Sequence, residues 1–120
     1  MESPFLISVN EVLLKNESRE EFSELLYTYT TRLQPANSAE IDLVEEMVMA
    51  RWRHRRYWRI EGALLDSVME LQVEGDSPKT GAPQKALKLA AQFQNSSRRS
   101  HERSHKMLLH LRESGCLSPE

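Results

Sequence analysis

Cysteine, glycine, proline and long apolar runs are all scarce in this sequence. Its single cysteine, Cys116, excludes an intrachain disulfide and is compatible with a reducing compartment. The four glycines and five prolines lie mostly outside the segments with helical periodicity, which favours long helices. No apolar run approaches the roughly 20 residues of a membrane span, and residues 1–10 lack the basic start of a signal peptide. We therefore expect a cytoplasmic protein that makes no membrane contact.

Charge is unevenly distributed along the chain, although the net charge is only −2. Residues 1–48 hold ten acids and three bases, and residues 62–78 hold four acids and no base. Residues 49–61 hold five arginines and one acid, and residues 79–120 hold eight bases and three acids. Such alternation indicates either internal charge complementarity or a localised basic site.

A first helix is predicted over about residues 18–33. Ser18-Arg-Glu-Glu21 has the pattern of a capping box, in which the serine accepts from a helical amide and the glutamate reaches back. Pro35 ends this helix, because the residue before a proline avoids the α region. The apolar residues between these signals have helical spacing: Phe22, Leu25, Leu26, Tyr29 and Leu33.

A hairpin of two longer helices is predicted to follow. Asn37 begins a helix that spans about residues 38–74 with apolar residues at helical spacing, and Gly75 is a natural stop. After a loop rich in glycine and proline, Pro83 suits the first turn of a helix over about residues 83–113.

These elements predict an all-α chain built on an elongated antiparallel helical hairpin. At about 1.5 Å per residue the long helices measure roughly 55 and 46 Å, whereas a compact globule of this size has a radius of gyration of about 14 Å. The shorter N-terminal helix makes the architecture three-helix bundle-like. We expect one helical domain over residues 18–115, an extended arm or short strand over residues 1–17, and a tail over residues 116–120.

Self-association is also expected, because such a long, thin hairpin leaves apolar flanks uncovered. The residues that motivate this expectation spread over more than one face of the second helix: Leu64, Leu65, Val68, Met69 and Leu71. The predicted partner is a second copy of the chain, in a homo-oligomer.

The most unusual segment is residues 49–60, MARWRHRRYWRI, with five arginines, a histidine and three aromatic residues. If the hairpin turns midway along its loop, Arg59 lies beside Arg99 and Arg55 beside Arg103. The two basic clusters then form one arginine belt, which also contains His54, His101 and His105. Like charges this close need a negative partner, either an external polyanion or the chain's own glutamates.

The first helix is a source of such glutamates. The turn at Pro35 folds this helix back and brings its acidic residues level with residues near 47–54. The acids concerned are Glu17, Glu20, Glu21 and Glu24.

A helical wheel divides the belt into an inward and an outward set. The inward face of the third helix carries Ser97, Ser100 and Ser104, and these small residues leave room for a tryptophan or an arginine stem. The inward set is expected to form a structural polar core, partly buried and paired with acids: Arg51, Trp52, Arg55, Trp58 and Glu61. The outward set is expected to form the polyanion-binding surface: Arg53, Arg56, Arg59, Arg98, Arg99 and Arg103.

His101, Glu102 and His105 match the H-E-x-x-H motif of zinc proteases and fall on a predicted helix. That chemistry requires two histidines on one face, a glutamate that activates water, and a third ligand. The glycine and third histidine of the extended motif do not follow in this sequence. We therefore expect neither enzyme activity nor a cofactor, and we interpret these histidines as solvated helix positions. A zinc-dependent hydrolase, or weak metal binding that also involves His54, is the alternative.

A longer pattern runs through the chain: a Leu-x-Pro turn, a Leu-Val-Glu helix start, Trp-Arg-x-x-Arg, and a glutamate followed by small and leucine residues. It comprises Leu33 and Pro35, Leu43-Val44-Glu45, Trp52-Arg53 with Arg56, and Glu61 with Ala63-Leu64-Leu65. In this pattern the chain resembles a group of small, uncharacterised helical bacterial proteins, over about residues 12–112. Members are sometimes labelled transposase-like, and they usually begin with a basic segment that this sequence lacks. The resemblance implies a helical fold and no mechanism, and the histidines are outside the shared pattern.

Two functional hypotheses follow from the arginine belt. The first is a non-enzymatic helical module that docks on nucleic acid or a nucleoprotein assembly. The second is a protein–protein assembly or scaffold element whose arginines are neutralised internally. Binding through several phosphate contacts weakens steeply with salt, whereas an internally neutralised belt binds no polyanion, so salt dependence separates them.

Overall fold

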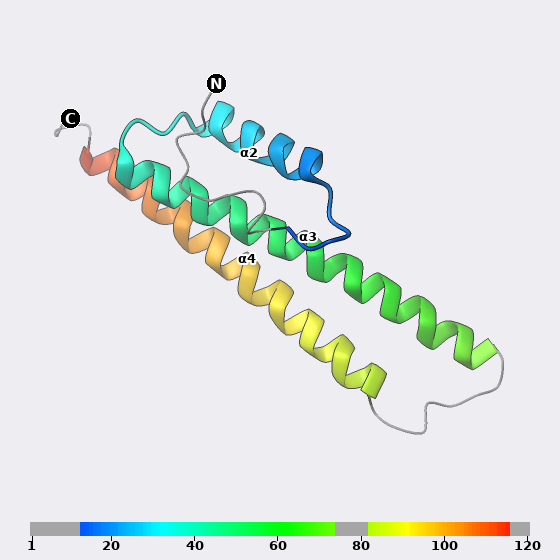
Figure 1. The fold of residues 1–120 in the computed structure, drawn as a ribbon. Coiled ribbons are helices and arrows are strands. Elements are labelled where there is room, and N and C mark those ends of the chain that lie inside the picture. The colour runs from blue at the N-terminus through cyan, green and yellow to red at the C-terminus, as the bar shows by residue number, and fades with distance from the viewer. Residues whose placement is uncertain (1–12, 74–81, 116–120) are drawn as a thin grey trace.

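A computed structural model describes residues 13–73 and 82–115, and within these ranges the only regular elements are helices (Figure 1). They are α2 (Arg19–Leu33), α3 (Ser38–Val73) and α4 (Ala82–Gly115). The prediction of an all-α chain is confirmed, and the predicted helix bounds are close to the observed ones. Residues 13–17 form a turn in which the Glu17 amide donates to the Leu14 carbonyl over 3.0 Å. The rest of the predicted arm, and the predicted tail, lie outside the described residues.

Local side chains set the helix ends as the sequence indicates. The Ser18 hydroxyl accepts from the Glu21 amide over 3.2 Å, and the Asn37 side chain accepts from the Glu40 amide over 2.9 Å. Gln34 ends α2 in the left-handed region with φ of 42°. Glu21 does not complete the capping box, because its carboxylate pairs with an arginine of α3 instead.

The hairpin of α3 and α4 gives the molecule its elongated shape (Figure 1). The described chain measures 65 × 29 × 19 Å, and its radius of gyration of 18.6 Å exceeds the roughly 14 Å of a compact globule of this length. Helix α3 is continuous over 36 residues, and α4 runs back along it. The predicted hairpin is therefore confirmed. The connecting residues 74–81 lie outside the described part of the chain.

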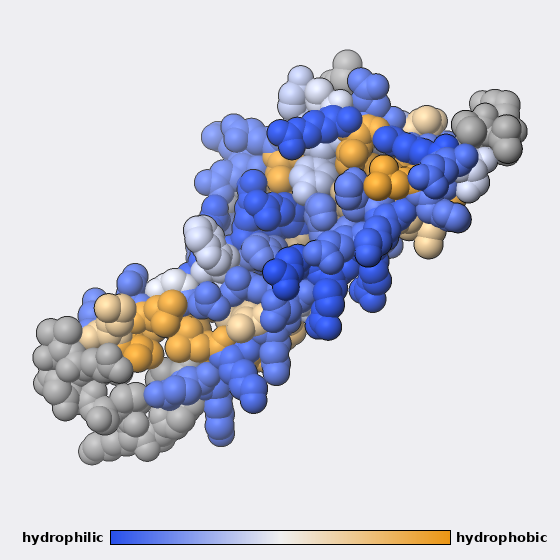
Figure 2. Space-filling model, turned by 180° about the vertical axis from the view of Figure 1, so that it is seen from behind, coloured by the Kyte–Doolittle hydropathy of each residue, from blue (hydrophilic) through white to orange (hydrophobic). Residues whose placement is uncertain are grey.

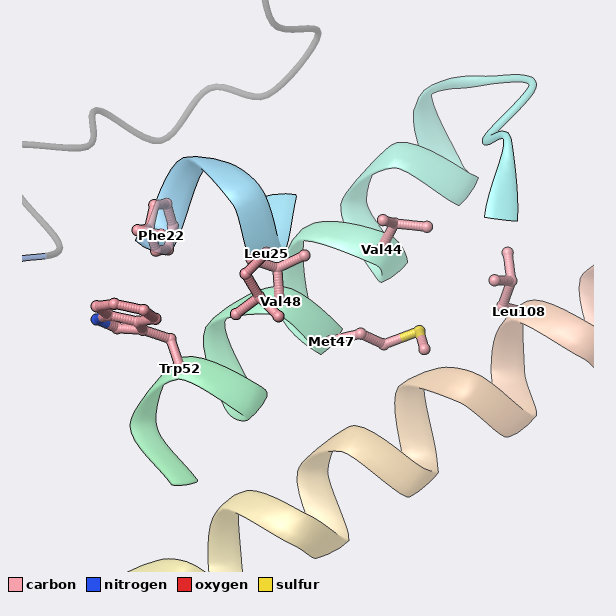
Figure 3. Packing of buried hydrophobic residues seen from close by; sticks show 7 residues of the cluster. All are labelled: Phe22, Leu25, Val44, Met47, Val48, Trp52 and Leu108. Carbon is pink, nitrogen blue, oxygen red and sulfur yellow. The ribbon is translucent and has the colours of Figure 1, made fainter. Parts of the chain in front are cut away.

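The apolar core lies at the end of the hairpin that α2 flanks (Figure 3). Trp52 of α3 is 1% exposed and meets Phe22 of α2 edge to face, with ring centroids 5.2 Å apart. Leu108 of α4 closes the cluster from the other side. The complete buried cluster is Phe22, Leu25, Val44, Met47, Val48, Trp52 and Leu108.

The other end of the hairpin consists of two helices alone, since the 15 residues of α2 flank only the first part of α3 (Figure 1). Figure 2 shows apolar side chains beside the loop end, separated by a hydrophilic band from the apolar side chains of the other end. Leu65, Met69 and Leu89 are each between 45% and 62% exposed in this two-helix end. This two-helix end, residues 60–70 with residues 84–93, has no third helix against it among the described elements.

Candidate polyanion-binding site

The Glu17 carboxylate is buried beside α3 and holds Arg56. One oxygen accepts from the Arg56 terminal nitrogen over 2.8 Å, and the other accepts from Arg56 Nε over 2.8 Å. The Trp52 indole donates to the first oxygen over 3.2 Å. The side chains of Glu17 and Arg56 are 7% and 16% exposed. This two-pronged, charge-assisted contact lowers the pKa of Glu17 to about 2, chiefly through the Arg56 hydrogen bonds, and raises that of Arg56.

Two further arginines have acidic partners. Arg59 pairs with Glu21 over 2.7 Å at an exposed position. Arg112, near the end of α4, pairs with Glu40 over 2.8 Å and also donates to the Leu33 carbonyl at the end of α2. Arg112 therefore joins all three helices at the end of the bundle where α2 meets α3.

The structure corrects the predicted division of the belt. Arg51 is exposed and Trp58 is 64% exposed, although both were expected in the polar core. Arg56, expected on the outer surface, is the arginine that is buried and paired. Arg55 is half-buried, but among residues 13–73 and 82–115 it has no carboxylate partner.

The reason for the correction is the position of α2. It covers the face of α3 on which Val48, Trp52 and Arg56 follow one another at four-residue spacing, and Arg59 continues that face. The helical wheel was oriented on the face toward α4 alone. It assigned Arg56 to the wrong side, and Trp52, which was expected against the serine face of α4, is buried against Phe22 of α2 instead.

The register of the hairpin also differs from the predicted one by several residues. Tyr57 stacks on Phe93 with ring centroids 4.8 Å apart, and Gln94 donates to Glu61 over 3.0 Å. Glu61 thus makes a polar contact across the helices, as expected. Arg103 consequently shares a groove with Arg53 instead of lying level with Arg55.

The predicted serine face of α4 is confirmed. Ser97 and Ser104 are 6% and 5% exposed, and the Ser104 hydroxyl donates to the Glu46 carboxylate over 2.9 Å. Small side chains here let the two long helices approach each other. Ser97 lines two of the hollows that the described helices leave in the belt.

The first hollow, here called the α3/α4 groove, is lined by these two helices alone. Its volume is about 320 Å³. It combines two arginines with serine hydroxyls and the stacked ring pair: Arg53, Tyr57, Phe93, Ser96, Ser97, Ser100 and Arg103. Arg53 and Arg103 also line a neighbouring hollow, where Glu45 and Glu46 lie beside them. The positive charge of the α3/α4 groove is therefore strongest at the end that Tyr57 and Phe93 line.

The second hollow, here called the three-helix hollow, lies between α2, α3 and α4. Its volume is about 500 Å³. Its ionisable lining is basic, apart from the Tyr29 phenol: Arg32, Arg51, His54, Arg55, Arg98 and His101. Burial is the main cause that lowers the pKa of both histidines, and the charge of Arg51 adds to it. Tyr29 Oη lies 2.6 Å from His101 Nε2.

Among the described residues, most arginines of the belt have no acidic partner. Within residues 13–73 and 82–115, no ion pair joins a carboxylate to any of Arg32, Arg51, Arg53, Arg55, Arg98, Arg99 and Arg103. Of the predicted polyanion-binding set, Arg56 and Arg59 are therefore engaged with glutamates, and the other four arginines remain candidates. Arg32 also belongs to this unpaired group, although a single arginine in the first helix carries no distinguishing signal in the sequence.

In the described chain, the first histidine of the H-E-x-x-H motif contacts a side chain of α2. His101 is hydrogen-bonded to Tyr29, and its ring centroid lies 6.4 Å from that of His105. In the part of the chain that the structure describes, no group of three or more His, Cys, Asp or Glu side chains is placed to hold a metal. Nothing in the observed geometry adds a third ligand to this pair.

No family model, curated protein or solved structure matches this chain. The resemblance to small helical bacterial proteins therefore stays a prediction. Over residues 13–73 and 82–115, no helix has an apolar stretch long enough to cross a membrane.

Glu17→Gln is expected to destabilise the fold by about 2–3 kcal/mol at pH 7, since it removes a buried carboxylate from its guanidinium partner. The pKa of Glu17 in the folded state, about 2, lies below its ordinary 4.5. The stabilisation is therefore complete above about pH 4.5 and is lost as the pH falls toward 2. Urea unfolding of both proteins across this pH range measures the difference, which should shrink with acidification.

The matched control is Glu20→Gln, which removes an exposed carboxylate three residues away. Its effect should stay within about 0.5 kcal/mol at each pH. Equal effects of the two substitutions, or a Glu17 effect that does not change with pH, would contradict the assignment.

Proposed function

We propose that this chain is a non-enzymatic helical module that binds a nucleic-acid strand, free or within a nucleoprotein assembly, through the α3/α4 groove. The observation that carries the proposal is the unequal pairing of the arginines. Arg53, Arg99 and Arg103 have no carboxylate partner among the described residues, whereas Arg56, Arg59 and Arg112 each have one. Among the described residues, internal neutralisation therefore accounts for only part of the belt.

A phosphate backbone suits the remaining arginines. Like charges held on facing helices repel each other, and an external anion relieves that repulsion. Arginine guanidinium groups hold phosphate oxygens in a two-pronged geometry, and neighbouring serine hydroxyls add hydrogen bonds. Ser96 and Ser100 line the groove beside Arg53 and Arg103.

The aromatic pair favours a single strand over a duplex. Phe93 is 41% exposed and stacks on Tyr57 within the same groove. Proteins that bind single strands combine a basic groove with aromatic rings on which unpaired bases stack. A duplex keeps its bases stacked inside and offers its backbone alone to such a groove.

A second candidate function is protein–protein assembly, and the two-helix end favours it. Its apolar side chains lie where α2 provides no cover, and Met69 is 62% exposed. Two copies joined through these ends would bury both helices of each hairpin in a four-helix arrangement. This assembly leaves the belt accessible, so it is compatible with strand binding.

Strand binding is tested by fluorescence anisotropy with a labelled single-stranded oligonucleotide at increasing salt. With three phosphate contacts, from Arg53, Arg99 and Arg103, the affinity should fall roughly 20-fold between 50 and 200 mM salt. The double substitution Arg53→Ala with Arg103→Ala should weaken binding at least about tenfold and flatten the salt slope. The duplex form of the probe should bind more weakly.

Arg59→Ala is the matched control, because Arg59 lies on the same helix but pairs with Glu21. Its affinity should stay within about twofold of the unsubstituted chain. The proposal fails if no strand binds at low salt, or if Arg59→Ala weakens binding as much as the groove variant.

Assembly through the two-helix end is tested by sedimentation at micromolar concentration. The chain should sediment as a dimer or a larger species, and Met69→Glu should shift it toward monomer by placing a charge in an apolar contact. Met107→Glu, at a methionine that is 50% exposed near the other end of α4, should leave the distribution unchanged. A monomer without any substitution would contradict this assembly.

A further inference from the structure

We propose that the three-helix hollow is a binding site for a compact oligophosphate, a small molecule that carries two or more linked phosphates. This site is separate from the α3/α4 groove and does not depend on strand binding there. Four guanidinium groups from three helices line it: Arg32 of α2, Arg51 and Arg55 of α3, and Arg98 of α4.

The charge of the hollow is unbalanced in the described chain. No aspartate or glutamate belongs to its lining, and none of the four arginines has a carboxylate partner within residues 13–73 and 82–115. The nearest acids have other roles. Glu21, which lines the adjoining hollow, pairs with Arg59, and Glu102 acts on His101 only through its charge.

His54 and His101 add hydrogen-bond donors to the hollow but little positive charge at neutral pH. Burial and neighbouring charge lower the pKa of His54 and His101 below the ordinary value, so both rings are mainly neutral at pH 7. Burial also raises the pKa of Tyr29, which keeps its phenol neutral. The phenol therefore donates to His101 Nε2, and the other ring nitrogen of His101 carries the proton.

The number of arginines indicates several phosphates on one molecule. A guanidinium group engages one phosphate through two parallel hydrogen bonds, so four of them match a ligand with clustered charge. A nucleic-acid strand instead separates successive phosphates by a sugar, whereas the phosphates of an oligophosphate are linked directly through a bridging oxygen. The hollow draws its arginines from three helices, and a small ligand reaches all of them at once.

The size and the apolar part of the lining agree with this ligand class. A volume of about 500 Å³ lies within the roughly 300–1,000 Å³ typical of small-molecule sites. Leu25 and Ala50 are buried residues that contribute apolar wall between the arginines. An organic group attached to the phosphates would rest there, whereas an inorganic oligophosphate would use the arginines alone.

The test is isothermal titration calorimetry of the full chain with tripolyphosphate and with ATP as probes, at constant ionic strength. We expect saturable binding of one probe molecule per chain, and sulfate at the same ionic strength should bind at least about tenfold more weakly. Tighter binding of ATP than of tripolyphosphate assigns the site to organic oligophosphates. The reverse order assigns it to inorganic ones.

Arg98→Ala and Arg99→Ala form the matched pair, because these neighbours on α4 are both exposed and only Arg98 lines the hollow. Arg98→Ala should weaken tripolyphosphate binding at least about tenfold, and Arg99→Ala should change it less than about twofold. Thermal unfolding without a ligand should be the same for both variants, which excludes misfolding as the cause.

The proposal is overturned if neither oligophosphate binds, if sulfate binds equally well, or if the two substitutions weaken binding alike. The groove variant with Arg53→Ala and Arg103→Ala should bind tripolyphosphate normally. If it does so while strand binding is lost, the two sites are distinct. A chain that binds a strand but no oligophosphate would refute this inference and leave the groove proposal standing.

Discussion

A carboxylate that is removed from water needs a charged partner, and in this chain Glu17 obtains one from Arg56. The contact joins the residue just before α2 to the middle of α3, and Trp52 completes it from the same helix face. Breaking this buried pair should cost about 2–3 kcal/mol, because a charge removed from water loses its main partner. The contact therefore fixes where α2 lies on the hairpin, together with the ring contact between Phe22 and Trp52.

The position of α2 determines which arginines are neutralised. Glu17 before α2 and Glu21 within it reach one face of α3, where they engage Arg56 and Arg59. The arginines on the other faces of α3, and those midway along α4, have no such partner among the described residues. Glu17 and Glu21 thus supply two of the described arginine–carboxylate pairs. Figure 2 shows a hydrophilic band between the apolar side chains of the two ends of the hairpin.

The fold could be predicted from the sequence because its signals are local. Ser18 and Asn37 begin helices through their own side chains, Pro35 follows the end of one, and the long periodic segments contain no internal breaker. The pairing of the arginines could not be predicted in the same way. It depends on which face of α3 a separate helix covers, and a shift of a few residues in register moves Arg103 from Arg55 to Arg53.

Trp52 and Trp58 show which parts of the predicted polar core differ from the structure. Trp52 was expected in the interior and is 1% exposed, but it packs against Phe22 of α2 and not against the serine face of α4. Trp58 is also near arginines in the same segment, but it lies outside the buried cluster and is 64% exposed. The three-helix hollow was not predicted, because Arg32 and His101 meet there from helices far apart in sequence.

Hydrogen exchange at the arginine Nε–H groups, followed by NMR, distinguishes the paired arginines from the unpaired ones. Arg56 and Arg112 donate these protons to Glu17 and Glu40. Their exchange with solvent should be at least about tenfold slower than that of Arg53 and Arg99. Rapid exchange at Arg56, or equal protection at all four arginines, would contradict the account.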